Sequence, residues 1–420
     1  MTNSNVAERQ SWYQNPWMIV AMLCVVGCLN YLDRMVIATM RGSIMETIPM
    51  SEAQFGLLTS VFLWTYGLVS PLMGFLADRF NKSKIIILSL FVWSVVTWLT
   101  GHATTFNELL ATRVLMGISE ACYIPAALGL IVEYHRGNTR SLATGIHVAG
   151  IIAGQSLGFT GGWLAEKYDW TFAFTVFGFI GVVQAVLLLF FLRDKKKPII
   201  ANPEIGIKPV KEKVQLTAAL KTLLTNKNFL LLLSFYSLVA IVAWMTIGWL
   251  ATFMKERFDL SQTDAGIYST AYIYPLAFVG AILGGWLADR YSKKYHRARI
   301  LVPVFGLLAA TPFVFIAGIS TWLPLTIFSF MVFSCTRVFA DANIMPIICQ
   351  IVESKYTSTA MGVVNACACI VGGLGLFASG ALRDSQVNLG TMFQIASIFM
   401  ILAILLLNKI NPPKQNLSQS

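Results

Sequence analysis

Charged residues are scarce in this chain of 420 residues, where Asp, Glu, Lys and Arg together account for 12%. A soluble domain usually carries about a quarter of its residues as charged side chains, so this chain cannot cover a water-exposed surface. Hydrophobic residues make up 56% of the sequence, and its mean hydropathy is +0.67. The composition therefore predicts an integral membrane protein.

Catalytic and metal-binding patterns are also missing. No apolar stretch pairs a nucleophile with a plausible base, and the sequence contains no His-Glu-x-x-His motif. All seven cysteines fall within apolar stretches, where a thiol behaves as a small apolar group. We therefore expect a protein that is not an enzyme and has no catalytic residues, no cofactor, no disulfide and no metal site.

Twelve apolar runs of roughly 20 residues follow one another, each long enough to cross about 30 Å of hydrocarbon. They lie at about Met18–Met40, Phe55–Leu76, Ile85–Gly101, Glu108–Val132, Leu142–Leu164, Phe172–Leu192, Phe229–Met254, Ala265–Leu287, Ile300–Ile319, Trp322–Val352, Thr359–Leu382 and Gly390–Leu407. A polar stretch from Arg193 to Asn228 separates the sixth run from the seventh. We expect an all-α membrane protein with twelve transmembrane helices: an N-terminal six-helix bundle in residues 1–194, a cytoplasmic linker at 195–228 and a C-terminal six-helix bundle in residues 229–420.

Lysine and arginine are unevenly distributed across this topology. With the N-terminus in the cytoplasm, 23 of the 31 basic residues fall in cytoplasmic segments and five in outside loops. Cytoplasmic loops of membrane proteins carry such an excess, so both termini are expected in the cytoplasm. The net charge of +11 is then an orientation signal and an attraction to anionic lipid, and it does not indicate nucleic-acid binding.

The two halves of the chain repeat each other. Residues 74–79 read Gly-Phe-Leu-Ala-Asp-Arg at the end of the second run, and residues 285–290 read Gly-Trp-Leu-Ala-Asp-Arg at the end of the eighth. Residues 112–114 and 336–338 both read Thr-Arg-Val. Parallel repeats of six spans are typical of secondary transporters, which hold substrate between the repeats near the middle of the membrane. The Gly-x-Leu-Ala-Asp-Arg loop resembles the signature loop of the major facilitator superfamily, and the resemblance covers essentially the whole chain.

Two further motifs point to a subfamily. Residues 30–34 read Asn-Tyr-Leu-Asp-Arg, and residues 113–121 read Arg-Val-Leu-Met-Gly-Ile-Ser-Glu-Ala. Together they resemble the anion:cation symporter family, which includes sugar-acid permeases, sialin and vesicular glutamate transporters. Spinster-like lipid transporters share an Asn-Tyr-x-Asp-Arg and an Arg and Glu in the fourth span, so these motifs alone do not separate the two families. Pro125 and Trp249-Leu250 favour the anion symporters, whereas Cys122-Tyr123 departs from their usual Gly-Phe.

Six charged residues lie deep within the predicted spans, where a charge is costly and marks a functional candidate. They are Asp33, Glu120, Asp341, Arg34, Arg113 and Arg337. Arg113 and Glu120 are seven residues apart and share a helix face, and Arg337 and Asp341 are four apart and can pair directly. One interpretation is that the six residues neutralise one another and join the halves. The other is that they bind substrate and protons.

The chemistry of these groups suggests their roles. Arginine offers a planar fork of donors that grips a carboxylate, so Arg113 and then Arg34 are the first candidates for binding a substrate anion. An acid shielded from water takes up a proton more readily than an acid in water, so Asp33 and Glu120 are candidates for proton coupling. In the anion symporters that this chain resembles, the matching acids carry protons and the matching arginine of the fourth span meets the substrate.

Other polar residues are weaker candidates. Four residues are expected either to contact the substrate or to pack between helices: Tyr66, Gln155, Asn365 and Tyr272. Tyr274 and His147 are further possibilities of the same kind. Five loop residues are expected to form gating contacts that set the conformation of the carrier: Asp78, Arg79, Arg140, Asp289 and Arg290.

The leading hypothesis is a proton-coupled symporter that moves a small organic anion by alternating access, with a sugar acid such as a hexuronate, an aldonate or sialic acid as its substrate. The alternative is a spinster-like carrier of lysophospholipid or sphingoid lipid. Sodium in place of protons stays open, and so does the direction of transport. We expect a monomer in a bacterial inner membrane, with membrane lipid as its other partner and no nucleic acid.

Overall fold

The computed structural model describes residues 15–135, 139–194 and 216–412, without the side chains of residues 74–79, 216 and 354. Within these residues the chain is helical and contains no strand. The helices are α1 (Pro16–Thr39), α2 (Arg41–Thr47), α3 (Glu52–Arg79), α4 (Lys82–Thr100), α5 (Phe106–Glu120), α6 (Tyr123–Tyr134), α7 (Arg140–Ser156), α8 (Phe159–Lys167), α9 (Trp170–Phe191), α10 (Leu216–Thr225), α11 (Lys227–Phe258), α12 (Gln262–Thr270), α13 (Ile273–Ser292), α14 (Ala298–Ile319), α15 (Leu323–Arg337), α16 (Phe339–Ile351), η4 (Ser354–Tyr356), α17 (Thr357–Asp384) and α18 (Leu389–Asn408).

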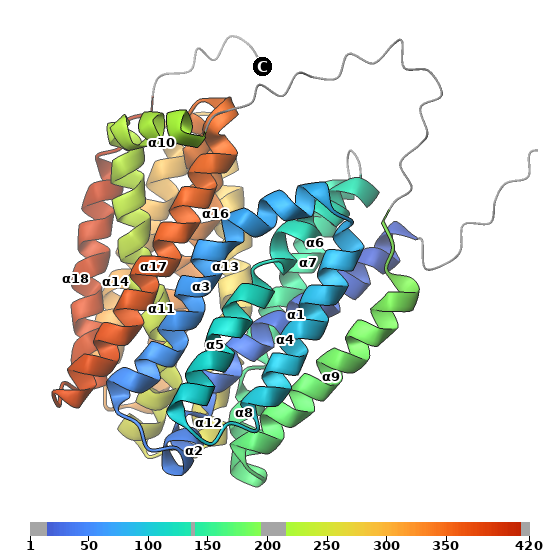
Figure 1. Ribbon diagram of the computed structural model, residues 1–420. Helices are drawn as coiled ribbons and strands as arrows, with labels where there is room; N and C mark the ends of the chain where they lie inside the picture. The colour runs from blue at the N-terminus through green and yellow to red at the C-terminus, as the bar shows by residue number, and fades with distance from the viewer. Residues whose placement is uncertain (1–14, 136–138, 195–215, 413–420) are drawn as a thin grey trace, which may run out of the picture.

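These helices supply the twelve predicted membrane spans (Figure 1). Eight spans are continuous helices, and the fourth, fifth, eighth and tenth are each broken into two. The fourth span breaks directly after Glu120 and the tenth directly after Arg337. Two of the charged residues within the membrane therefore lie at interruptions of a helix, as is common near the binding sites of transporters.

The breaks in the fifth and eighth spans face each other. Thr270, the last residue of α12, donates its hydroxyl to the carbonyl oxygen of Ser156 at 3.2 Å and accepts the N–H of Phe159 at 3.1 Å. A break in a membrane helix frees backbone groups that need partners, because lipid offers none. The side chain of Thr270 therefore joins the two spans where their helices are interrupted.

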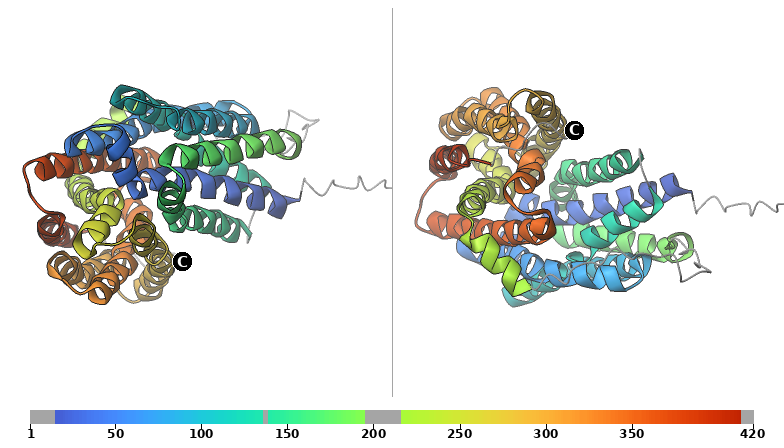
Figure 2. Two further views of the ribbon diagram at one scale, coloured as in Figure 1. Left: turned by 90° about the horizontal axis from the view of Figure 1, so that it is seen from below. Right: turned by 90° about the horizontal axis from the view of Figure 1, so that it is seen from above.

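The helices of residues 16–191 and those of residues 216–408 form two groups that lie side by side (Figure 2). We call them the first group and the second group. They meet mainly through α3 against α17 and through α8 against α12. The predicted linker contains α10, and its residues 195–215 lie outside the described residues. The division of the chain at 194 and 229 remains a prediction.

The two ends of the molecule differ in how the groups meet. We call the end where α9 ends and α10 begins the linker end, and the opposite end, which carries α2, the α2 end. In the described part of the chain, every hydrogen bond between the groups lies from mid-membrane toward the α2 end. The bond from Trp64 Nε1 to the carbonyl oxygen of Ile370, at 3.0 Å, is among the deepest. Among the described residues, the interface is therefore fastened by hydrogen bonds toward the α2 end and has none toward the linker end.

Candidate functional site

A cavity of about 590 Å³ lies between the two groups. Its lining comes from α1 and α7 of the first group and from α11, α12, α13, α15, α16 and α17 of the second. Apolar side chains form most of the wall, including Ile151, Ile152, Ile247, Leu250 and Ile273. We call this space the central cavity. A cavity between two repeats near mid-membrane is where secondary transporters hold their substrate.

Arg337 and Asp341 are the two charged residues in the lining of the central cavity. Arg337 Nη2 lies 3.1 Å from Asp341 Oδ2, and the two side chains are 16% and 37% exposed. Tyr236 of α11 donates its hydroxyl to the other carboxylate oxygen, Oδ1, at 3.3 Å. The two residues therefore pair with each other at the break between α15 and α16 while both face the cavity.

The four charged residues deep within the spans of the first group are enclosed in protein. Arg34 Nε donates to Glu120 Oε2 at 2.7 Å, and the two side chains are 4% and 0% exposed. The guanidinium of Arg34 also lies 4.5 Å from the centre of each of the rings of Tyr31 and Tyr66. Removing one partner of such a buried pair would leave the other charge uncompensated, at a cost of about 3–5 kcal/mol. Arg34 and Glu120 therefore depend on each other.

Asp33 and Arg113 are also buried, close to that pair. The hydroxyl of Thr97 donates to Asp33 Oδ2 at 3.3 Å. Arg113 Nη2 donates to Thr100 Oγ1 at 3.0 Å, and its guanidinium lies 5.6 Å from the centre of the Phe174 ring. Neither Asp33 nor Arg113 lines the central cavity. The four charged residues deep within the spans of the first group are thus each in contact with neighbouring side chains of that group.

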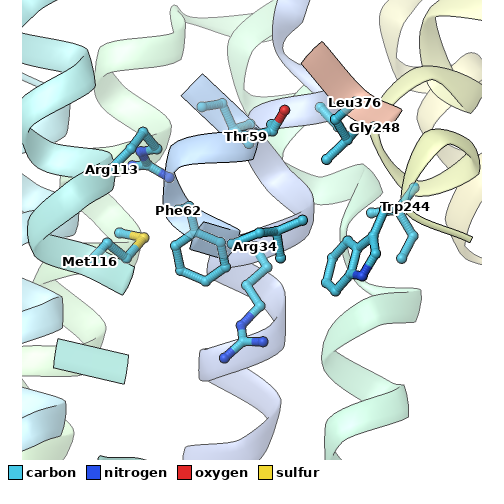
Figure 3. A pocket seen from close by; sticks show the side chains of 12 residues that line it. Arg34, Thr59, Phe62, Arg113, Met116, Trp244, Gly248 and Leu376 are labelled. Carbon is cyan, nitrogen blue, oxygen red and sulfur yellow. The ribbon is translucent and has the colours of Figure 1, made fainter. Parts of the chain in front are cut away.

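A small cavity of about 30 Å³ borders this buried set (Figure 3). Arg34 and Arg113 line it together with Trp244 of α11. A space of this size holds about two water molecules, and a sugar acid does not fit. Ala38 and Ile247 line both this small cavity and the central cavity, so the two spaces adjoin. Arg113, the first candidate for an anion ligand, therefore faces room for water and not a substrate-sized space.

The remaining substrate candidates have different surroundings. Gln155 lines the central cavity, and Tyr66 is buried beneath Arg34. Asn365 is half-buried on α17, and Tyr272 is 46% exposed; neither lines that cavity. Tyr274 lines it instead, because two residues on a helix separated by one position point to nearly opposite sides.

Five charged residues from both groups meet at the α2 end. They are Arg41, Glu52, Glu256, Arg383 and Asp384, and we call them the α2-end cluster. Arg41 and Arg383 both bond to Glu52, from Arg41 Nε at 3.1 Å and from Arg383 Nη2 at 3.2 Å. Arg383 also donates two hydrogen bonds to Glu256, at 2.9 and 2.7 Å. The cluster therefore ties α2 and α3 of the first group to α11 and α17 of the second.

Two further features strengthen the α2-end cluster. Asp384 accepts the N–H groups of Glu52 and Ala53, at 2.9 and 3.0 Å, and a carboxylate is favoured at a helix N-terminus because of the helix dipole. The guanidinium groups of Arg41 and Arg383 lie 5.8 and 5.5 Å from the centre of the Trp249 ring. The cluster thus combines ion pairs, a helix cap and cation–π contacts across one interface.

The predicted gating residues lie at the linker end. Asp289 pairs with Arg299 of the same group at 3.4 Å, and Arg290 lies over the ring of Trp286 at 5.4 Å. Arg140 is exposed, and the side chains of Asp78 and Arg79 lie outside the described residues. A gating role for these residues stays a prediction for a state in which the linker end is closed.

The sequence was compared with models of known protein families. The model of the Major Facilitator Superfamily matches residues 23–376 and, in a second match, residues 236–420. The chain belongs to the major facilitator superfamily. The resemblance inferred from the Asp-Arg loops is thereby confirmed. Members of this superfamily are transporters, so the chain is a membrane transporter and not an enzyme.

Curated proteins similar to this superfamily member are spinster proteins. Protein spinster homolog 1 of Bos taurus is 30% identical over 316 residues, which are 71% of this chain and 60% of the relative. Protein spinster of Drosophila melanogaster is 27% identical over 71% of this chain and 50% of its own length. Protein spinster homolog 3 of Danio rerio is 26% identical over 91% of this chain and 78% of its own length. The chain thus spans 60% and 50% of the first two relatives.

Solved structures of spinster homologs have a fold similar to that of this chain. A bacterial homolog of the human lysosomal transporter Spinster, in an inward-facing and unoccupied conformation, has a TM-score of 0.76 at 22% identity, over 95% of both chains. The same kind of homolog in an inward-facing and occupied conformation has a TM-score of 0.74 at 21% identity, over 94% of this chain and 95% of the other.

Two sequence features have structural explanations outside the transport site. Residues 154–158 spell Gly-x-Ser-x-Gly, a pattern that serves catalysis only on a sharp turn between a strand and a helix. Here Ser156 ends helix α7 and donates its hydroxyl to the carbonyl oxygen of Ile152 at 2.9 Å. His147 is buried, with Nε2 2.8 Å from the hydroxyl of Tyr123. Ser156 is therefore satisfied within the packing of the first group, whereas Nδ1 of His147 is buried without a hydrogen-bond partner in the described part of the chain.

Proposed function

We propose that this transporter carries a single-chain amphipathic lipid, such as a lysophospholipid or a sphingoid lipid, through the central cavity. The observation that carries the proposal is the wall of that cavity, where apolar side chains outnumber the polar ones and a single charged pair faces the space. A sugar acid exposes hydroxyl groups on every side, and burying them without partners against Ile and Leu is costly. An acyl chain gains about 0.8 kcal/mol for each methylene group that it buries.

The comparisons support the same choice between the two hypotheses. The relatives found are spinster proteins, and the spinster-like family is the lipid-carrying one of the two that the motifs resemble. The small cavity beside Arg113, at about 30 Å³, also argues against a sugar acid bound to that arginine. The organic-anion hypothesis therefore becomes an outcome of the tests below.

The way the two groups meet supports alternating access as the transport mechanism. The α2-end cluster fastens one side of the interface, so a lipid enters or leaves the central cavity from the linker end in this conformation. The excess of Lys and Arg near the linker end supports a cytoplasmic position for that end. In the other half of the cycle the α2-end cluster separates and the linker end closes, through the predicted gating residues.

In this proposal, the buried charged residues of the first group couple proton movement to transport. The pair of Arg34 and Glu120 adjoins the small cavity, which in turn adjoins the central cavity. A proton that reaches Glu120 through water removes the carboxylate charge and its attraction for Arg34. Arg34 then loses its ionic partner, and the contact between α1 and α5 weakens. Protonation thus changes the packing of helices that border the site.

Purified protein in a neutral detergent is expected to bind lysophosphatidylcholine and not glucuronate. A ligand at 100 times its Kd adds about 2.7 kcal/mol to the stability of the protein, so the lysolipid should raise the melting temperature measurably. Phosphocholine without an acyl chain is the control and should have no effect. Stabilisation by glucuronate or another sugar acid, with no response to lysolipid, would overturn the proposal in favour of an anion symporter.

A further inference from the structure

The two repeats of this transporter place their matching arginines in different surroundings. Arg113 and Arg337 occupy equivalent positions in the Thr-Arg-Val repeat. Arg113 is 2% exposed and bonds to Thr100 inside the first group, whereas Arg337 lines the central cavity. Arg337 is therefore available to a substrate in the central cavity, and Arg113 is not.

The pair of Arg337 and Asp341 keeps unused hydrogen-bonding capacity. Arg337 has five N–H donors, and Asp341 is its only ion-pair or hydrogen-bond partner in the described part of the chain. Asp341 has one contact on each carboxylate oxygen, from Arg337 and from Tyr236, and its side chain remains 37% exposed. Both residues can therefore bind a ligand group while the ion pair between them stays intact.

From this arrangement we infer that Arg337 and Asp341 recognise a zwitterionic headgroup, with the phosphate at Arg337 and the ammonium at Asp341. A purely anionic ligand at Arg337 would place a second negative charge beside Asp341 in a largely apolar cavity, where like charges repel strongly. A purely cationic ligand at Asp341 would place a second positive charge beside Arg337. A zwitterion supplies a partner to each residue, so neither charge is left alone.

Apolar side chains beside the pair of Arg337 and Asp341 can contact the acyl chain of the ligand. Val148, Ile151 and Ile152 of α7 face the cavity together with Ile273 and Ala277 of α13. The pair lies mid-span at the break between α15 and α16. A headgroup held there leaves the acyl chain against α7 and α13. The inference rests on the proposed function and adds the headgroup class to it.

Single-chain amphiphiles that share one hydrocarbon chain length and differ in headgroup test the inference. The panel consists of zwitterionic lysophosphatidylcholine, anionic lysophosphatidylglycerol, a cationic alkyltrimethylammonium and neutral monoacylglycerol, and the Kd of each is measured on the full chain in neutral detergent. The wild type should bind the zwitterion at least tenfold more tightly than either singly charged lipid. Asp341→Asn should shift the preference to the anionic lipid, and Arg337→Gln should shift it to the cationic one.

The matched controls are Glu353→Gln and Lys355→Gln, which change another ion pair of the second group, between α16 and α17. These variants should keep the wild-type order of preference. Binding of monoacylglycerol shows that each variant is folded, and comparing lipids within one variant makes the order independent of its stability. If all headgroups bind alike, or if Asp341→Asn and Arg337→Gln keep the wild-type order, the inference is wrong although lipid transport stands. If no amphiphile binds at all, the proposed function fails and the inference fails with it.

Discussion

Replacing Arg383 with alanine is expected to open the α2 end. Arg383 makes two hydrogen bonds to Glu256 of its own group and one to Glu52 of the other group, and its loss leaves Arg41 as the arginine that still contacts both acids. Hydrogen bonds to charged groups contribute about 1.5–3 kcal/mol each, reduced here by partial exposure to solvent. A net change of about 1–3 kcal/mol would shift the balance of the two conformations by between about fivefold and 150-fold.

Distances between spin labels across the α2 end measure this shift. The labels are placed on exposed residues of the two groups in a cysteine-free background, because the described residues include seven free cysteines. Arg257→Ala is the matched control, since Arg257 lies at the same end but bonds to carbonyl oxygens of Ser320 and Ile319 within its own group. Arg383→Ala should add a long-distance population that Arg257→Ala lacks. Identical distance distributions in the two variants would mean that the α2-end cluster does not set the conformation.

Replacing Glu120 with glutamine is expected to abolish transport driven by a pH gradient. Glutamine keeps the shape of the side chain and an oxygen that accepts the Arg34 N–H, but it cannot take up a proton. Uphill uptake of the lipid should therefore fall at least tenfold, whereas exchange of lipid between the two sides of the membrane should continue. Both rates are measured in liposomes that contain the purified protein.

Glu133→Gln is the control for Glu120→Gln, because both acids belong to the fourth span. Glu133 pairs with Lys82 at 2.7 Å near the linker end, outside the buried set. This variant should retain driven uptake. If Glu120→Gln also retains it at the wild-type rate, Glu120 does not couple protons to transport. If Glu120→Gln loses exchange as well, the residue serves the structure of the carrier and its charge change is not the coupling step.

Much of the architecture could be predicted from local patterns of the sequence. Each span is a single apolar run, and a run of roughly 20 residues has few structural options in a membrane. The superfamily follows from the two Asp-Arg loops, because each is a short contiguous motif. The six charged residues in the spans are also visible locally, since a charge inside an apolar run stands out against its neighbours.

The orientation of those charges is not visible in the sequence. Thr112-Arg113-Val114 and Thr336-Arg337-Val338 look alike, yet Arg113 is enclosed and Arg337 faces the central cavity. The difference depends on the neighbours that other spans supply, such as Thr100 for Arg113. Sequence spacing gives the face of one helix and says little about what packs against that face.

The α2-end cluster was not predicted from the sequence, for a related reason. Glu52 and Arg383 are 331 residues apart in the chain and meet at 3.2 Å. In the sequence each is an ordinary charge at the end of a span, where charged residues are common. A partial signal exists, because Arg383-Asp384 ends the eleventh span and Glu52 begins the second, and α3 and α17 pack together over much of their length.

Movement of lysophosphatidylcholine across liposomes that contain the purified protein tests the central claim most directly. A fluorescent lysophosphatidylcholine is supplied on one side, its appearance on the other side is followed with and without a pH gradient, and radiolabelled glucuronate is assayed in parallel. We predict movement of the lysolipid that requires the protein and is accelerated by the gradient, with no accumulation of glucuronate. Accumulation of glucuronate, without any movement of lysolipid beyond that in protein-free liposomes, would contradict the account.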